Sequence, residues 1–357
     1  MHVAEPLGHK ERIAGLWRAA RAGRLGHAFL FEGPAGIGKF AAAVWFAAGM
    51  LCRSGPGAPC GVCPPCKQVA TAGWRGGHPD LLRIDPVEEG WDEIPIGAIA
   101  ERSTDRNEGQ SLAAFLSLRA LMGDWRLVLV REAERLNEHA QNALLKTLEE
   151  PAAGTVIVLE CSNPAELLAT VRSRVVRLAL AAPGPEVAVA VLEQKGVAAP
   201  AAHTLADLAD HSPGEALRLE RQGALELLDL LDRVLLPTAA AGTGVLAAAA
   251  SLWDGGGDFG EGTVLQQARR RARLVLELGM LLCARARRVA LGVGPTLTGP
   301  GGRAIEALVL RGETGIRSAF DGLAERRRDI DANLDPGAVI ELALLTLAAP
   351  AAALTTS

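Results

Sequence analysis

The fold of this chain is decided by one stretch, Gly33-Pro34-Ala35-Gly36-Ile37-Gly38-Lys39-Phe40. The apolar run Ala28-Phe29-Leu30-Phe31 precedes it and is typical of a short buried strand, and the alanine-rich residues 41–51 after it favour a helix. A strand, a glycine-rich loop and a helix in this order form a phosphate-binding P-loop, because backbone N–H groups, the helix N-terminus and a lysine converge on phosphate oxygens. The stretch therefore predicts an α/β P-loop domain whose nucleotide cradle consists of Gly33, Pro34, Ala35, Gly36, Ile37, Gly38, Lys39 and Phe40.

Two positions that hold magnesium in P-loop ATPases carry other residues here. The residue after the lysine should be Ser or Thr, but it is Phe40, which has no oxygen on its side chain. The apolar run 125–130 predicts a later buried strand, and Arg131 stands after it where such enzymes place a magnesium-holding Asp. Glu132 retains the next acid, which in such enzymes often polarises the attacking water. The sequence thus keeps the cradle and lacks two magnesium ligands.

Four cysteines follow the predicted P-loop helix with the spacing C-x7-C-x2-C-x2-C, and they are Cys52, Cys60, Cys63 and Cys66. This spacing suits four thiolates around one tetrahedral Zn²⁺, and a site made of four cysteines leaves no position for a substrate. We therefore expect a structural zinc site. Four unligated thiols, or a redox role for the overlapping CxxC pairs, are the alternatives. Cys161 and Cys283 lie in apolar segments and are expected to be buried thiols.

The composition limits the classes of protein that the chain can represent. A length of 357 residues favours two or three domains, and 49% hydrophobic with 22% charged residues indicates a folded protein. The net charge of −4 provides no global basic field for nucleic acid, so any DNA contact must be local or shared with partners. Residues 1–12 contain no apolar signal core, and no apolar run has the length of a membrane span. We therefore expect a cytoplasmic protein without a membrane partner, in which cysteines are reduced.

Further elements are predicted along the chain. A helix is expected over about residues 10–22, and strands over 78–86, 155–159 and 175–180. A helix with Leu112, Phe115, Leu116 and Leu118 on its apolar side should follow a polar loop at 102–110, and residues 137–148 should form a helix that Pro151 ends. After Pro183-Gly184-Pro185, apolar residues follow helical spacing to the C-terminus, with glycine-rich breaks near 254–262 and 292–302.

The order of these motifs resembles the bacterial clamp-loader ATPase family, within the AAA+ class. The resemblance rests on the P-loop, the cysteine module, the string 142–151 (Asn-Ala-Leu-Leu-Lys-Thr-Leu-Glu-Glu-Pro) and Arg172-Ser173-Arg174. It is strong over about residues 8–220 and looser in the helical tail, which includes 333–341. It implies an AAA+ domain (1–182) with a zinc module at about 52–66, a helical lid (183–222) and an all-α collar for oligomerisation (223–357).

The resemblance also implies partners and a role for one arginine. Members of the family form a five-subunit ring through their collars, with motor ATPase subunits and a delta-like subunit, and load a sliding clamp onto primed DNA. They usually read Ser-Arg-Cys where this chain has Ser173-Arg174-Val175, and the arginine reaches the ATP of a neighbouring subunit. By this resemblance Arg174 is a catalytic arginine finger that acts in trans. Without the surrounding motifs, an arginine near a strand end is usually a solvated surface charge.

A third departure concerns Glu215, in the string Ser212-Pro213-Gly214-Glu215-Ala216-Leu217, where ATPases of the family usually have an arginine directed at the γ-phosphate. Arg218 is too far along to replace it. Each missing group of this kind costs ~10²-fold or more in rate. We therefore expect a non-hydrolysing clamp-loader subunit, in which Lys39 and the loop still allow weak ATP binding. The alternatives are an active motor subunit of the same loader, and a zinc-dependent DNA-binding protein unrelated to replication, which the charge of −4 disfavours.

Overall fold

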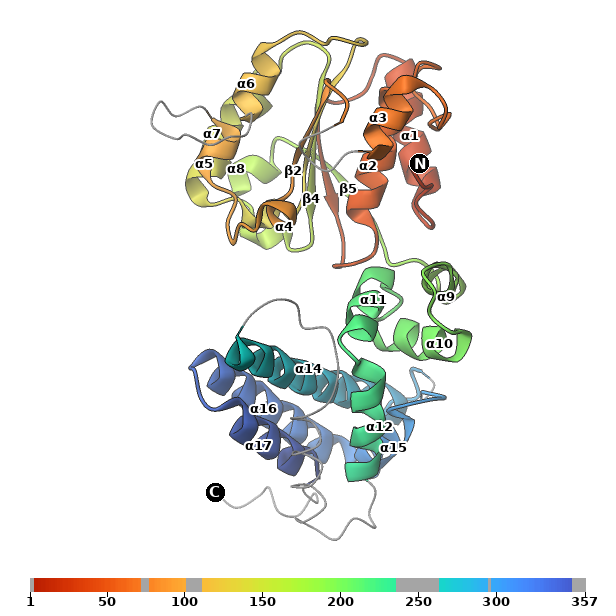
Figure 1. Ribbon diagram of the computed structural model, residues 1–357, viewed down its shortest axis with the longest axis vertical. Coiled ribbons are helices and arrows are strands. Elements are labelled where there is room, and N and C mark those ends of the chain that lie inside the picture. The colour runs from red at the N-terminus through yellow and green to blue at the C-terminus, as the bar shows by residue number, and fades with distance from the viewer. Residues whose placement is uncertain (1–2, 72–76, 101–110, 236–262, 295–296, 349–357) are drawn as a thin grey trace. The chain divides into compact units, whose positions relative to one another are not determined.

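The computed structural model describes residues 3–71, 77–100, 111–235, 263–294 and 297–348. The chain forms two compact units, residues 1–187 and 188–357 (Figure 1). Separate groups of buried apolar residues make the core of each unit. The predicted loop at 102–110 and the predicted glycine-rich break at 254–262 lie wholly outside the described residues.

The first unit is built on a five-stranded parallel sheet with the strand order β2-β3-β4-β1-β5. The strands are β1 (Ala28–Glu32), β2 (Leu81–Ile84), β3 (Arg126–Val130), β4 (Thr155–Cys161) and β5 (Val176–Ala179). Strand β1 lies inside the sheet, between β4 and β5. In open parallel sheets, ligand sites form in the crevice beyond the carboxyl ends of such strands, and the predicted P-loop begins at that end of β1.

Helices cover both faces of this sheet (Figure 1). One face packs against α1 (Lys10–Arg21), α2 (Lys39–Met50) and α3 (Pro64–Thr71). The other packs against α5 (Ile96–Ile99), α6 (Leu112–Ser117), α7 (Glu138–Glu149) and α8 (Ala169–Arg172). The short elements α4 (Pro86–Glu89), η1 (Ala133–Arg135) and η2 (Pro164–Glu166) complete the unit. Because successive strand residues point to opposite faces, a strand covered on both sides is mainly apolar, which explains the continuous apolar runs in the sequence.

Several predicted elements are confirmed. The P-loop helix begins at Lys39 itself, and α7 begins after Asn137, whose side-chain oxygen accepts a hydrogen bond from the Ala140 N–H at 2.9 Å. An asparagine at this position satisfies one of the free N–H groups at a helix start. The helix ends just before Pro151, as predicted.

Two details of the prediction are wrong. Strand β2 is shorter than 78–86, because His78 to Asp80 lie in a turn and Asp85 caps α4 instead of continuing the strand. Leu118 does not lie on the apolar side of α6, which ends at Ser117; its backbone is extended and it is 56% exposed. The carbonyl oxygen of Leu118 accepts a hydrogen bond from Arg126, which holds the chain away from the helix.

The second unit is helical in its described residues. Its helices are α9 (Pro185–Gln194, which begins just before the unit boundary), α10 (Ala199–Leu208), α11 (Pro213–Arg221), α12 (Ala224–Val234), α14 (Val264–Ala290), α15 (Gly302–Val309), α16 (Gly312–Asp331) and α17 (Pro336–Ala348). A single group of buried residues runs through them. The division of the chain into domains 1–182, 183–222 and 223–357 stays a prediction. Among the described residues, no helix has both the length and the apolar character needed to cross a bilayer.

Candidate functional site

The predicted P-loop joins β1 to α2 in a conformation that requires its glycines. Gly36 and Gly38 have φ angles of 72° and 92°, in the left-handed region that glycine adopts at low cost. A Cβ on Gly33 would lie 2.1 Å from the carbonyl oxygen of Leu180, so no side chain fits there. The buried His9 ring lies behind the loop, with Nε2 2.8 Å from the carbonyl oxygen of Ile37. The loop is therefore shaped by its own sequence and held from behind.

The side chain of Lys39 is turned into the protein. It is 3% exposed, and Nζ lies 2.8 Å from the carbonyl oxygen of Pro34, 2.8 Å from Oγ of Ser162 and 3.0 Å from Oε1 of Glu160. An ammonium group has three N–H donors. The Lys39 ammonium group, which a P-loop uses to bind phosphate, therefore has three partners within the chain.

Glu160 is the ionic partner of Lys39. It lies on β4 opposite Phe31 of β1, on the same face of the sheet as Val156 and Val158, which pack against α2. The Glu160 residue is only 6% exposed, and its Oε2 accepts a hydrogen bond from the Glu132 N–H at 2.9 Å. A buried charge is tolerated only when it is paired and hydrogen-bonded, and Glu160 meets both conditions.

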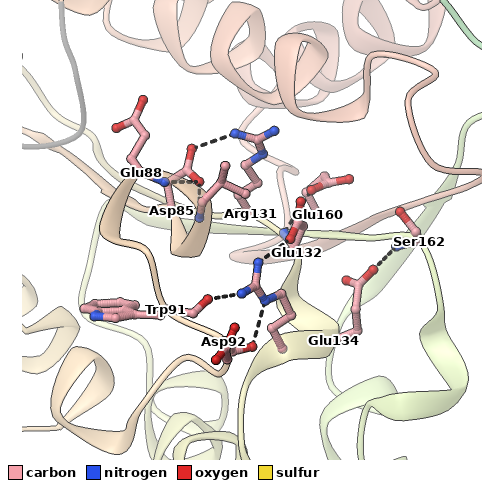
Figure 2. Close-up of polar contacts among 11 residues, drawn as sticks. Asp85, Glu88, Trp91, Asp92, Arg131, Glu132, Glu134, Glu160 and Ser162 are labelled. Carbon is pink, nitrogen blue, oxygen red and sulfur yellow. Dashed lines mark hydrogen bonds and ion pairs between the residues drawn. The ribbon is translucent and has the colours of Figure 1, made fainter. Parts of the chain in front are cut away.

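The two residues that replace magnesium ligands contact each other. The Arg131 guanidinium carbon lies 5.4 Å from the centre of the Phe40 ring, within the range of a cation–π interaction. Nη1 of Arg131 also pairs with Oδ2 of Asp85 at 3.0 Å, and Figure 2 draws this contact. The other oxygen of Asp85 caps α4 by accepting the Val87 N–H. Because arginine stays protonated and offers only donors, this corner of the site carries a fixed cation.

Glu132, the residue at the position that polarises the attacking water in such enzymes, is paired with an arginine. Its φ angle of 48° turns the chain at the end of β3, and its Oε2 accepts a hydrogen bond from Nη1 of Arg135 at 2.9 Å. Arg135 also donates to the backbone carbonyl groups of Trp91 and Asp92. Glu134, on the next turn, accepts the Ser162 N–H at 2.8 Å. The ends of β3 and β4 are therefore tied together by side chains.

The four cysteines of the predicted metal site meet in space. Cys52 follows α2, Cys66 lies in α3, and Cys60 and Cys63 lie in the loop between them. Their sulfur atoms all lie within 4.8 Å of one another, and the Sγ atoms of Cys52 and Cys63 are 3.9 Å apart. Tetrahedral zinc with Zn–S bonds of about 2.3 Å requires sulfurs about 3.8 Å apart. Hydrogen bonds from the backbone of Cys63 and Val62 lower the pKa of Cys60 to about 6, which favours the thiolate. Cys161 and Cys283 are buried as predicted, and burial raises the pKa of Cys283 to about 12.

Arg174 lies on the surface between α8 and β5. Its Nε donates to Oε1 of Glu149 at 2.8 Å, Nη1 donates to the carbonyl oxygen of Thr170 at 3.0 Å, and its side chain is 36% exposed. The contact joins the two strings, 142–151 and 172–174, on which the resemblance rests.

Arg174 and the P-loop lie at opposite ends of the parallel strands β1 and β5. Arg174 comes just before the amino end of β5, whereas the P-loop follows the carboxyl end of β1, its parallel neighbour. An independent contact agrees, because Nε2 of His27, just before β1, lies 2.9 Å from the carbonyl oxygen of Leu148, which precedes Glu149. With five residues in β1, the two strand ends are on the order of 15 Å apart.

The third position that departs from the family pattern lies in the second unit. Glu215, in the first turn of α11, accepts a hydrogen bond from Nε of Arg218 at 2.8 Å. Arg218 also donates to Gln222 and pairs with Glu277 of α14. The arginine nearest to this position is therefore held by acceptors within its own unit.

The sequence interpretation missed Glu160 and Asp85, which neutralise the two cations of the site. A signal for Glu160 was present: it has the same parity as Val156 and Val158 in a strand buried on both faces, so its carboxylate had to face a buried partner. Asp85 directly before a proline carried the signal of a helix cap. Which cation each acid meets depends on the order of the strands.

Comparison with known proteins gives a matching family model and relatives that are subunits of DNA polymerase III. Residues 8–183 match the family model described as DNA polymerase III, delta subunit. The DNA polymerase III subunit delta' of Pseudomonas aeruginosa is 37% identical over 222 residues, which are 59% of this chain and 62% of the relative. Subunit delta' of Bacillus subtilis is 34% identical over 159 residues, 44% of this chain and 43% of the relative. Subunit tau of Salmonella typhimurium is 32% identical over 180 residues, 50% of this chain and 25% of the relative. The match thus spans less than two thirds of the length of each relative.

Proposed function

We propose that this chain, which belongs to the clamp-loader AAA+ family, is a delta'-like subunit of the DNA polymerase III clamp loader. In this role it hydrolyses no ATP itself and donates Arg174 to a neighbouring motor subunit. It would take part in a pentameric ring with motor subunits and a delta-like subunit, and through the ring in loading the sliding clamp onto primed DNA. The observation that carries the proposal is the contact of Arg131 with Phe40 and Asp85. Phe40 and Arg131 stand at the two positions where P-loop ATPases hold magnesium, and neither can coordinate it.

The absence of hydrolysis follows from the charges at this corner. Phosphoryl transfer in P-loop enzymes depends on a magnesium ion held by a hydroxyl group and a carboxylate. Here a ring and a guanidinium occupy the two positions, and Asp85, the acid next to Arg131, is already paired with it. Glu132, which could polarise a water molecule, is paired with Arg135. Each of these pairings would have to break before the site could bind a divalent ion and act on ATP.

The role of Arg174 in trans is supported by its position. Since Arg174 lies at the amino ends of the strands and its own P-loop lies at their carboxyl ends, any nucleotide phosphate that Arg174 contacts belongs to another subunit. Its ion pair with Glu149 is half-exposed on both sides, and such pairs contribute only about 0–1 kcal/mol. Arg174 can therefore exchange Glu149 for a more strongly charged phosphate at little cost. A finger of this type raises turnover by ~10³-fold or more at the site it completes.

The cysteine cluster has a structural role in the proposal. Cys52, Cys60, Cys63 and Cys66 would hold one Zn²⁺ and fix the loop between α2 and α3. A closed set of four sulfur ligands gives folding energy and leaves the ion no free coordination position. Hydrolysis chemistry is therefore not assigned to this metal.

The proposal is tested by replacing Arg174 in the reconstituted loader. Arg174→Ala should strongly reduce the clamp- and DNA-stimulated ATP turnover contributed by the adjacent motor site, while assembly of the ring is retained. Arg177→Ala is the matched control, because Arg177 belongs to the same segment, is 58% exposed and pairs with Glu32. Stimulated turnover that stays at the wild-type level in the Arg174→Ala loader would refute the finger role.

A second candidate function is that of an active motor subunit of the same loader. The match to subunit tau of Salmonella typhimurium and the formed P-loop favour it. It requires the isolated chain to hydrolyse ATP in a magnesium-dependent manner. A turnover assay on the purified chain, with Lys39→Met as the control for contaminating ATPase, separates the two functions.

A further inference from the structure

The Lys39–Glu160 ion pair is enclosed in the first unit. The side chains of Lys39 and Glu160 are 2% and 8% exposed, and their nearest charged atoms are 3.0 Å apart. Lys39 is the first residue of α2, and Glu160 approaches it from β4 at the neighbouring strand end. Neither charge is shared with solvent, so each neutralises the other.

A bound nucleotide would have to change this pairing. A phosphate in the cradle needs the Lys39 ammonium group, and it would add negative charge next to the Glu160 carboxylate. Like charges at such a distance in a poorly solvated site repel strongly. Glu160 also cannot leave freely, because its Oε2 accepts the Glu132 N–H at 2.9 Å and that oxygen is anchored to the end of β3.

We propose that Glu160 is an internal anion that occupies Lys39 in place of a nucleotide phosphate and so keeps nucleotide out of the P-loop. The negative charge of Glu160 would then exclude nucleotide, although the glycines still give the loop a backbone conformation suited to phosphate. This role of Glu160 concerns the chain by itself, and it holds whether or not Arg174 acts on a neighbouring subunit.

The carboxylate and the shape of its side chain can be separated by one substitution. Glu160→Gln removes the negative charge and keeps one oxygen that can accept from Lys39, while its amide NH₂ replaces the oxygen that accepts the Glu132 N–H. The full-length variant should bind ADP and ATP at least about tenfold more tightly than the wild type, since one like charge next to the phosphates is gone. The gain should be the same with and without Mg²⁺, because Phe40 and Arg131 are still in place.

The experiment is a calorimetric titration of the isolated full-length chain with ADP and with ATP, each in Mg²⁺ and in EDTA. Glu166→Gln is the matched control, because Glu166 is an exposed glutamate just beyond the same strand, and it should bind like the wild type. Adding Lys39→Met to Glu160→Gln should abolish the gain. Equal nucleotide affinity in the wild type and in folded Glu160→Gln, judged by circular dichroism, overturns the proposal.

A measurement on the unchanged protein keeps the test open if Glu160→Gln does not fold. Lys39 should react slowly with an amine-acylating reagent compared with Lys10, whose side chain is 58% exposed, and added ADP should not change the rate at which Lys39 reacts. Mass spectrometry of the peptides gives both rates. Fast acylation of Lys39, or slower acylation when ADP is added, would show that the ammonium group is free or meets nucleotide, and either result overturns the role of Glu160.

Discussion

Gly49 of α2 lies directly under the carbonyl oxygen of Gly57, so a Cβ built on Gly49 would be 2.0 Å from that oxygen and 2.4 Å from the ring of Trp17. The loop that carries the cysteines is therefore folded down onto the P-loop helix. Arg21 of α1 holds the same loop through a 2.6 Å hydrogen bond to the carbonyl oxygen of Pro56. The predicted zinc module and the P-loop helix form one packed structure.

Gly49→Ala is predicted to destabilise the first unit by about 1–3 kcal/mol, because the added methyl group overlaps backbone atoms that cannot rotate away. Gly15→Ala in α1 is the control, since the nearest side-chain atom of the described residues to its new Cβ is the end of the Arg18 side chain, at 3.9 Å. Without overlap, alanine in a helix stabilises by roughly 0.5–1 kcal/mol. Chemical denaturation of both variants measures the opposite signs; equal stability of Gly49→Ala and wild type would mean that the loop does not pack on α2.

The purified chain is predicted to contain one zinc ion per molecule, released when Cys63 is replaced. Cys63→Ala removes a ligand whose sulfur lies 3.9 Å from that of Cys52, and the remaining thiols cannot complete a tetrahedral set. Cys283→Ala is the control, because this thiol is buried in the second unit and should leave the metal content unchanged. Elemental analysis gives the stoichiometry, and a wild-type protein free of zinc, copper and iron after purification without chelators would contradict the site.

Strands β3 and β4 of the first unit could be predicted well from sequence, and the reason is their burial. Leu127 to Val130 and Val156 to Leu159 face helices on both sides, so every position is apolar and the segments stand out. The P-loop could be predicted for a different reason, since its glycines are required by backbone geometry that no other residue adopts cheaply. The spacing of the four cysteines likewise predicted that their sulfur atoms lie close together.

The ionic contacts of the site could not be predicted, because they join residues that are distant in sequence. Lys39 meets Glu160 only because β4 lies next to β1, and Arg131 meets Asp85 only because β2 lies next to β3. Sequence periodicity does not give the order of strands. The end of α6 was also missed, because Leu118 has an extended backbone and its carbonyl oxygen accepts a hydrogen bond from the Arg126 side chain, against its apolar pattern.

Arg131→Met is predicted to lower the unfolding free energy by about 1–3 kcal/mol, because it leaves the Asp85 carboxylate, 2% exposed, without its cation. Arg131→Met with Asp85→Asn should recover part of this loss, since the unpaired charge is then absent. The control is Arg273→Met, whose partner Asp331 is 56% exposed, and its effect should stay below about 1 kcal/mol. Denaturant titrations measure these three variants and Asp85→Asn alone; strictly additive effects of the two changes at Arg131 and Asp85 would indicate that the pair does not interact.

The Asp210–Arg288 pair is predicted to stabilise the second unit in a pH-dependent manner. A hydrogen bond from Arg288, 3.2 Å between Nη2 and Oδ2, lowers the pKa of Asp210 from its ordinary value of 3.8. A carboxyl group whose pKa is lower in the folded state stabilises the fold fully above the unfolded value, and this contribution is lost as the pH falls through the folded value. Since Asp210 is 60% exposed, the effect should be at most about 1 kcal/mol and should weaken in high salt.

The measurement compares wild type and Asp210→Asn by denaturation between pH 7 and pH 2. The difference in unfolding free energy should be constant down to about pH 4 and should then disappear toward pH 2. Asp321→Asn is the matched control, because Asp321 forms an ion pair with Arg317 in which the closest atoms are 3.8 Å apart and both side chains are mostly exposed. Its effect should be near zero throughout. A difference for Asp210→Asn that grows as the pH falls would have the opposite sign and would exclude a stabilising bond to Arg288.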